Sequence, residues 1–134
     1  MRKYILTMVL AIVSLTLSAA NHQAKVYMFG FAASFNDSTV VFTDIQQIDS
    51  AYIDSKTKFL YGREYYSGQL RNYLSQQDFV NPTCVTVFAT SRKEIEKKYS
   101  RLFKKYTNPK NKDKFIIKEI KSPDFVYEAV KFEQ

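Results

Sequence analysis

The sequence predicts a small α+β domain: a two-layer arrangement in which a mixed sheet of four or five strands carries two helices on one face. Three observations predict it. Apolar and polar residues alternate in short runs rich in β-branched and aromatic side chains, apolar residues recur at helical spacing over 91–107, and turn signals separate these segments. The expected order is β-β-α-β-α-β, with a further strand candidate at the end, and two layers are the usual way to bury such elements.

The first twenty residues have the three parts of a secretory signal peptide. Arg2 and Lys3 precede an uncharged, mostly apolar run over 5–17, and Ser18 and Ala20 supply small residues for cleavage after Ala20. A membrane-spanning helix needs about 20 apolar residues, so an uncleaved anchor is the weaker alternative. We therefore expect one mature domain, 21–134, in the periplasm or secreted. A short signal peptide before Lys- and Asn-rich loops is typical of a small bacterial envelope protein.

The first half of the mature chain predicts a hairpin. Residues 25–35 alternate with period two, which places Tyr27, Phe29, Phe31 and Phe35 on one face. The turn signal at 36–38 leads into a β-branched run over 39–45, so the two strands should be antiparallel. Residues 44–58 either extend the second strand or form a loop.

The second half alternates helices with strands. The helical spacing of Tyr66, Leu70, Tyr73 and Leu74 predicts a helix within 59–77, with Ser67-Gly68 as its N-terminus. A strand over 83–90 follows. Ser91 and Glu94 form a capping box for a helix over 91–107, which ends at Asn108-Pro109. Residues 115–121 and 125–132 are strand candidates, although a short helix is an alternative for the latter.

Positive charge is concentrated in one segment. The chain carries a formal net charge of +7, and residues 91–121 hold twelve Lys and Arg side chains against four acids. On the predicted helix the cations lie off the apolar stripe, which makes this face a candidate binding surface for an anionic envelope component: a lipid head group, an acidic glycan or an acidic protein. Export disfavours nucleic acid. The alternative is an ordinary solvated face. The candidate residues are Arg92, Lys93, Lys97, Lys98, Arg101, Lys104 and Lys105.

Aromatic and basic residues are interleaved over 59–68. Tyr61, Arg63 and Tyr65 are a second candidate contact surface, because exposed tyrosines stack on sugar rings or bases. The alternative is core packing, with Tyr66 and Tyr73 buried.

Histidine and cysteine are too scarce for most catalytic centres. The only histidine, His22, lies near the predicted mature N-terminus, where chains fray, and the only cysteine, Cys84, is expected to be a buried core residue. We find no cofactor motif and expect no metal site.

Three hypotheses follow. The first is a non-enzymatic exported binding module. The second is a small hydrolase that uses carboxylates, with Asp44, Asp49, Asp54 and Glu64 as candidates. The third is an envelope assembly component that pairs through an exposed strand edge.

Overall fold

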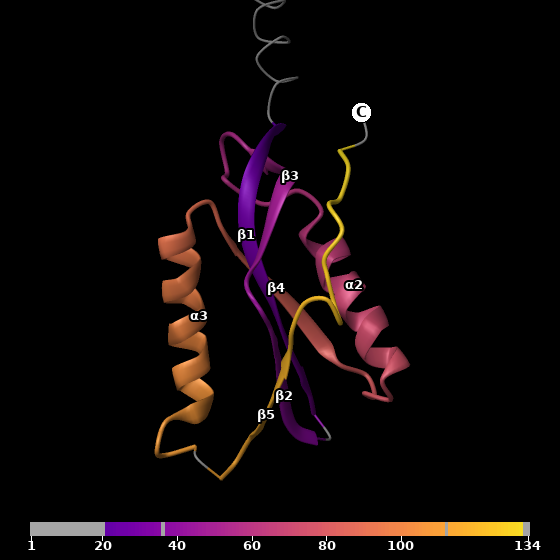
Figure 1. The fold of residues 1–134 in the computed structure, drawn as a ribbon, viewed down its shortest axis with the longest axis vertical. Helices are drawn as coiled ribbons and strands as arrows, with labels where there is room; N and C mark the ends of the chain where they lie inside the picture. The colour runs from indigo at the N-terminus through magenta and orange to yellow at the C-terminus, as the bar shows by residue number, and fades with distance from the viewer. Residues whose placement is uncertain (1–20, 36, 112, 133–134) are drawn as a thin grey trace, which may run out of the picture.

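The computed structural model describes residues 21–35, 37–111 and 113–132, so the predicted signal peptide lies outside the described residues. The α+β class, the mixed sheet with two helices and the element order are confirmed (Figure 1). Neither helix of the described part is long and apolar enough to cross a membrane. The elements are β1 (Asn21–Ser34), β2 (Asp37–Thr43), β3 (Gln46–Asp54), α2 (Arg63–Gln76), β4 (Thr83–Ala89), α3 (Arg92–Thr107) and β5 (Ile116–Ile120).

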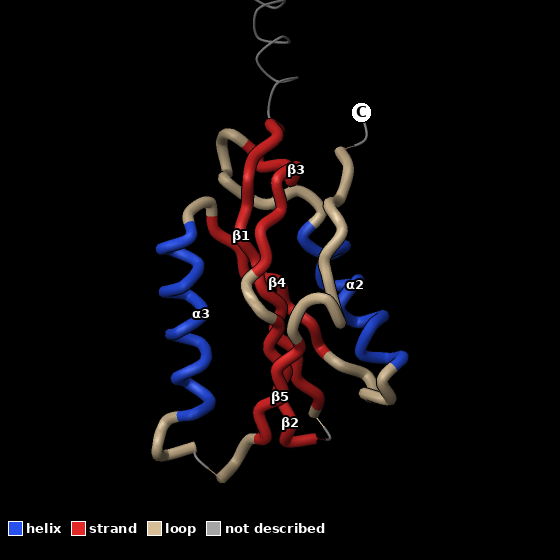
Figure 2. The backbone as a smooth tube through the Cα atoms, viewed as in Figure 1, coloured by secondary structure: helices blue, strands red, loops and turns tan. Residues whose placement is uncertain are grey.

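Strand β1 is the centre of the sheet. Phe31 of β1 is paired with Phe42 of β2 on one edge and with Val85 of β4 on the other. The first half of β1 is paired with β3 along the same edge that β2 occupies further on. Strands β2 and β3 therefore form two halves of one antiparallel path, interrupted at residues 44–45 (Figure 2). Of the two alternatives for 44–58, strand extension holds as far as Asp54.

The two helices cover opposite faces of the sheet, and not one shared face as expected. Met28 and Ala32 of β1 belong to the core under α2, whereas Phe29 between them belongs to the core under α3. Figure 1 shows the strands lying between the helices. The physical reason is that both alternating sets of β1 side chains are apolar, so each face of the sheet needs its own cover.

An aromatic layer joins α3 to the sheet. The ring centroids of Phe42 and Phe103 are 5.3 Å apart and those of Phe29 and Tyr99 are 5.0 Å apart, both edge to face. The predicted aromatic face of the first strand accordingly points into a core. Phe35 is the exception: it follows the end of β1 and is 100% exposed.

The helix starts follow from local chemistry. Helix α3 begins as predicted, because the Ser91 hydroxyl accepts a hydrogen bond of 3.2 Å from the Glu94 amide. Helix α2 begins at Arg63, four residues before the predicted start. Its N-cap is Gly62, whose φ of 73° is a left-handed value that glycine adopts without strain. Ser67 is inside the helix, and its hydroxyl is hydrogen-bonded to that of Thr86 at 2.8 Å.

Residues 125–132, here called the strap, form neither the predicted strand nor the alternative helix. The strap is extended and its side chains still alternate: Phe125 and Tyr127 are buried while Val126 and Glu128 are exposed. No strand of the described sheet pairs with it. The fifth strand of the fold is therefore β3, the continuation of the hairpin.

Side chains from the rest of the domain, here called the body, take the place of a neighbouring strand beside the strap. A glutamine amide carries one donor group and one acceptor, as a peptide group does, so a single side chain can satisfy both the C=O and the N–H of an extended segment. The Gln46 side-chain amide donates to the Phe125 carbonyl (2.9 Å) and accepts from the Tyr127 N–H (2.8 Å). The Gln69 side-chain amide donates to the Glu128 carbonyl (2.9 Å) and accepts from the Glu128 N–H (2.8 Å). The Tyr66 hydroxyl accepts from the Val130 N–H (2.9 Å).

Two buried tyrosines should respond oppositely to loss of their hydroxyls. The rings of Tyr66 and Tyr127 are 5.9 Å apart, yet the Tyr66 hydroxyl holds the Val130 amide whereas the buried Tyr127 hydroxyl has no hydrogen-bond partner. We expect Tyr66→Phe to lower the free energy of unfolding by about 1 kcal/mol, and Tyr127→Phe to leave it unchanged or raise it by up to about 1 kcal/mol. Urea unfolding measures both, and equal losses would contradict this.

The stability of Tyr127→Phe and of the wild type should respond differently to alkaline pH. Burial raises the pKa of the Tyr127 hydroxyl well above its ordinary value. Because the folded chain holds this proton more tightly than the unfolded chain, the stabilisation is complete below about pH 10 and decreases as the pH rises further. The unfolding free energy should therefore fall less steeply above pH 10 in Tyr127→Phe than in the wild type.

Candidate functional site

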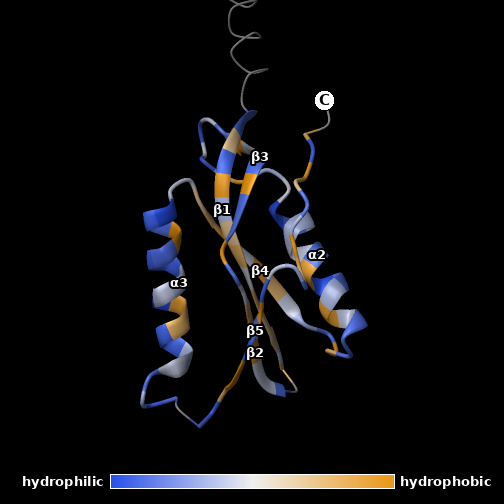
Figure 3. Ribbon diagram, in the orientation of Figure 1, coloured by the Kyte–Doolittle hydropathy of each residue, from blue (hydrophilic) through white to orange (hydrophobic). Residues whose placement is uncertain are grey.

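Four cations form a stripe on the outer face of α3. Lys93, Lys97, Arg101 and Lys104, here called the basic stripe, are all exposed. At 3.6 residues per turn they fall within about 80° around the helix and extend about 16 Å along it. The apolar residues of α3 that pack on the sheet lie on the opposite side of the helix, and Figure 3 shows this division in hydropathy. The stripe therefore points directly away from the core.

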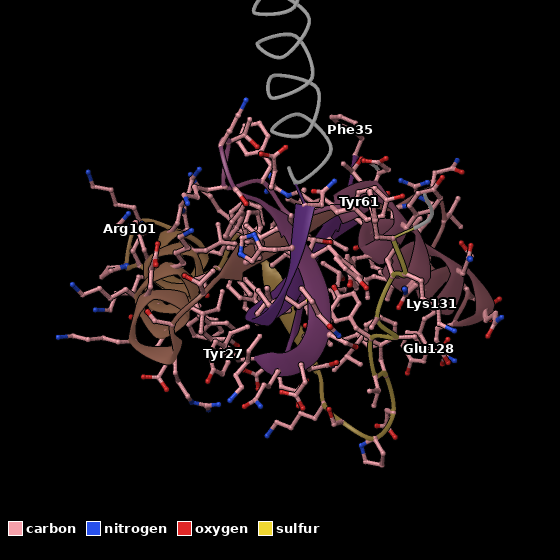
Figure 4. The ribbon with its side chains drawn as sticks, turned by 90° about the horizontal axis from the view of Figure 1, so that it is seen from above. Tyr27, Phe35, Tyr61, Arg101, Glu128 and Lys131 are labelled. Carbon is pink, nitrogen blue, oxygen red and sulfur yellow. The ribbon has the colours of Figure 1, made fainter. Side chains whose placement is uncertain are left out.

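The charges of the basic stripe are not neutralised by neighbours. In the described part of the chain the ion pairs within 4.0 Å are Arg92 with Glu96 and Lys98 with Glu94. Both pairs use other cations of α3, so none of the four members of the stripe has an acidic partner within this distance. Figure 4 shows Arg101 extending outward from α3, away from the strands. Of the seven predicted helix cations, the structure thus leaves four together and unpaired.

Lys98 and Lys105 lie on the flank of α3 rather than on the stripe. With Arg101 they surround a shallow hollow of about 340 Å³ whose floor is formed by Val87 and Leu102. The hollow combines an apolar floor with a cationic rim. It adjoins the basic stripe through Arg101.

One cation from each helix caps the free edge of β4. The Arg63 Nε donates to the Thr86 carbonyl at 2.8 Å, and the Lys98 Nζ donates to the Phe88 carbonyl at 2.9 Å. Both cations also lie over the Phe88 ring, 5.4 and 5.7 Å from its centroid. Among the described residues β4 pairs only with β1, so these bonds occupy outward carbonyls that another strand would need.

The structure separates the residues of the predicted aromatic surface. Arg63 reaches the β4 edge, whereas Tyr61 and Tyr65 lie beside the strap, where they line a hollow of about 290 Å³ with Val130 and Lys131. Residues two apart on a helix point about 200° away from each other, which divides Arg63 from Tyr65. Tyr65 is 62% exposed, while Tyr66 is fully buried.

The candidate carboxylates are spread out, and three of the four hold local structure. Asp44, Asp49 and Asp54 follow one another along the β2–β3 path, which spans about 33 Å from the first to the third. Amide hydrogen bonds from Thr57 and Lys56 lower the pKa of Asp54, which closes a turn. Asp44 accepts hydrogen bonds from the Gln46 side chain and the Ser122 amide, and Asp49 accepts one from the Gln47 side chain. Asp54 accepts from the amides of Lys56 and Thr57. Glu64 lies exposed in the first turn of α2.

The single histidine and cysteine both have structural places. His22 was expected in a frayed chain end, but it lies within β1, paired with Ile53, and its Nδ1 is 3.0 Å from the Ser55 hydroxyl. Cys84 is buried, and burial raises the pKa of its thiol, with a smaller opposing effect from Arg71. No group of three His, Cys, Asp or Glu side chains within the described ranges could hold a metal ion.

A third hollow was not anticipated from the sequence. It measures about 390 Å³ and lies between the turn after β3 and the start of α3. Lys58 and Phe59 from the turn face Phe88, Glu94 and Lys98. Lys58 has a left-handed φ of 63°. No local sequence signal could have revealed the hollow, because its lining joins two segments about thirty residues apart.

No protein-family model, no curated protein sequence and no solved structure matches this chain, so the arrangement of its own side chains carries the functional argument.

Removing the edge caps should expose β4. We expect the double variant Arg63→Ala/Lys98→Ala to self-associate at concentrations where the wild type does not, because the carbonyls of Thr86 and Phe88 become available to another strand. It should also lose about 1–2 kcal/mol of stability in total, since both cations are partly solvated. Sedimentation velocity measures the association.

The matched control is Arg71→Ala/Lys97→Ala, which also removes one exposed cation from each helix but uncaps no carbonyl. Equal association of the two double variants would mean that net charge, and not the capped edge, keeps the protein from pairing through β4.

Proposed function

We propose that the domain is an exported, non-enzymatic binding module whose basic stripe docks on an acidic polymer of the cell envelope. The supporting observation is that four unpaired cations line one helix face directly opposite the core. A rigid row of like charges attracts a polyanion and speeds its association, at the expense of self-repulsion in the free protein.

The composition of the exposed face of α3 favours a linear acidic polymer, such as an acidic glycan, over a lipid surface. A helix that docks on a bilayer carries large apolar side chains beside its cations. In the described residues the exposed large apolar side chains belong to other elements or loops, and α3 has none. A lipid surface is therefore the weaker partner for this face.

Charge reversal on the basic stripe should strongly weaken binding to an acidic glycan. We expect Lys93→Glu/Lys97→Glu/Lys104→Glu to lower the affinity for heparin, used as a model polyanion, by about a hundredfold or more, from about 1 kcal/mol per lysine near an anionic surface. The wild-type affinity should fall steeply with added salt. Heparin-column retention and titration calorimetry measure both.

The control is Lys25→Glu/Lys58→Glu/Lys131→Glu, which changes net charge equally at exposed lysines outside α3. Figure 4 shows Lys131 on the side of the molecule away from Arg101. An equal loss of heparin affinity in the control would show that net charge, and not the position of the lysines on α3, causes the effect. Stronger retention on vesicles of anionic phospholipid than on heparin would replace the glycan by a lipid surface.

The carboxylates support no second proposal. Glycosidases need two carboxyl groups within about 5–9.5 Å of each other, whereas Asp44, Asp49 and Asp54 follow each other at intervals of about 16 Å along the strand path.

Export by signal-peptide cleavage is part of the same proposal. Cleavage after Ala20 would remove only residues outside the described part of the chain. We expect mass spectrometry of the protein recovered from its natural host to show a chain that starts at Asn21. Ala20→Leu should block processing, since cleavage needs a small residue there, whereas Ala19→Leu should not. Natural protein that retains Met1 would overturn the proposal of export by cleavage.

A further inference from the structure

We propose that the strap is an exchangeable ligand, and that the groove it occupies between α2 and β3 binds the strap of a second copy of this chain. The inference concerns the side of the molecule away from the basic stripe and does not depend on the proposed function. Figure 4 shows strap residues Glu128 and Lys131 on the side opposite Arg101.

The groove grips the strap by its backbone. Each of the five hydrogen bonds between strap and body uses a side chain of Gln46, Gln69 or Tyr66. The strap adds no rung to the sheet, so its departure leaves the pairing of all five strands complete. Two glutamines that each satisfy both polar groups of an extended backbone are the chemistry of a peptide-binding groove.

Aromatic seats give the groove its selectivity. Phe125 and Tyr127 are buried in the core under α2, and Phe125 also packs on Tyr73 with ring centroids 5.3 Å apart. Further along, Phe132 lies edge to face against Tyr61 at 5.0 Å. A segment that fits must therefore carry large aromatic side chains two residues apart.

Two glycines hollow the body where the strap lies. A Cβ at Gly30 would collide with the Tyr127 hydroxyl and come within 2.6 Å of Leu70. A Cβ at Gly62 would lie 2.7 Å from Val130. Gly68, within α2, has open space instead. The vacant volume at Gly30 and Gly62 is shaped to the strap's own side chains.

A second copy is the occupant that this groove fits without adjustment. Its strap carries the same aromatic residues at the same spacing, so an exchange reproduces every contact and needs no new interface. Residues 121–124, which join β5 to the strap, are all exposed, and the Ser122 amide ties them to Asp44 by one hydrogen bond of 3.0 Å. The exchange breaks this bond and opens the segment as a hinge. Figure 1 shows the strap, in yellow, running beside α2 on the side of the helix that faces the strands. Two factors oppose this exchange: the entropy lost when two copies associate, and the high effective concentration of the strap beside the groove of its own chain.

Disulfide trapping tests the exchange. Asn72 of α2 and Val126 of the strap line one surface hollow. In a Cys84→Ser background, the double variant Asn72→Cys/Val126→Cys should close a disulfide within one chain, which reports the strap in its own groove. A mixture of the two single variants should instead give a covalent dimer linking residue 72 of one copy to residue 126 of the other.

The glycines provide the matched control. Gly30→Ala in the copy that offers the groove should lower the yield of this dimer by at least about fivefold, because a Cβ there would collide with the Tyr127 hydroxyl of the incoming strap. Gly68→Ala, where a Cβ meets open space, should leave the yield unchanged. Circular dichroism verifies that both variants are folded. Closure within the double variant without any dimer from the single variants, at millimolar protein and after long incubation, would overturn the proposal.

Peptide binding gives an independent measurement. A labelled peptide of residues 121–134 should bind the full chain carrying Phe125→Ala/Tyr127→Ala at least about tenfold more tightly than the wild type, because the weakened strap no longer competes for the groove. Circular dichroism verifies that this variant is folded. If the variant is unfolded, Val130→Ala, which shortens only the side chain that packs at Gly62, replaces it. Absence of binding to a folded variant, and no preference over a scrambled peptide, would overturn the proposal.

Discussion

Burial of β1 on both faces and both edges is the constraint from which the rest of the fold follows. Its two alternating sets of side chains are both apolar, and they belong to separate cores under α2 and α3. Its two edges are paired with β4 on one side and with β2 and β3 on the other. A strand buried in this way needs cover on each face, so the two helices cannot share one.

The margins of the sheet follow a second rule, in which side chains satisfy backbone groups that have no partner strand. Arg63 and Lys98 hold the outward carbonyls of β4, and Gln46 and Gln69 hold the strap. Buried or half-buried backbone groups without partners are costly, so each such place must be answered by some donor or acceptor. At β4 the two cations occupy carbonyls with which another strand could pair. Beside α2 the glutamines create a groove with the character of a peptide site.

The basic stripe and the strap divide the surface into two sides with different chemistry. The stripe offers charge on a rigid helix whose aromatic underside anchors it to the sheet through Phe29, Phe42 and Phe103. The strap side offers aromatic seats and amide clamps and carries little net charge. A long-range electrostatic contact suits the first side, and recognition of one defined peptide suits the second.

The sequence by itself determined the hairpin, the α+β class and the whole of α3, because period, turn residues and the Ser91 cap are local properties. The direction of the basic stripe followed from the same pattern, since cations placed opposite an apolar stripe must face solvent. The start of α2 was missed because Gly62 caps it through backbone conformation and no side chain takes part.

Tertiary structure alone decided which face each helix covers, how the β4 edge is capped and that residues 125–132 form a strap. Each depends on contacts between distant segments, such as Gln46 with Phe125, 79 residues apart. Side chains of the strap alternate as in a strand, with Phe125 and Tyr127 buried and Val126 and Glu128 exposed. This alternation could not reveal that glutamine side chains, and not another strand, would meet the backbone of the strap, because periodicity records burial and carries no information about the hydrogen-bond partner.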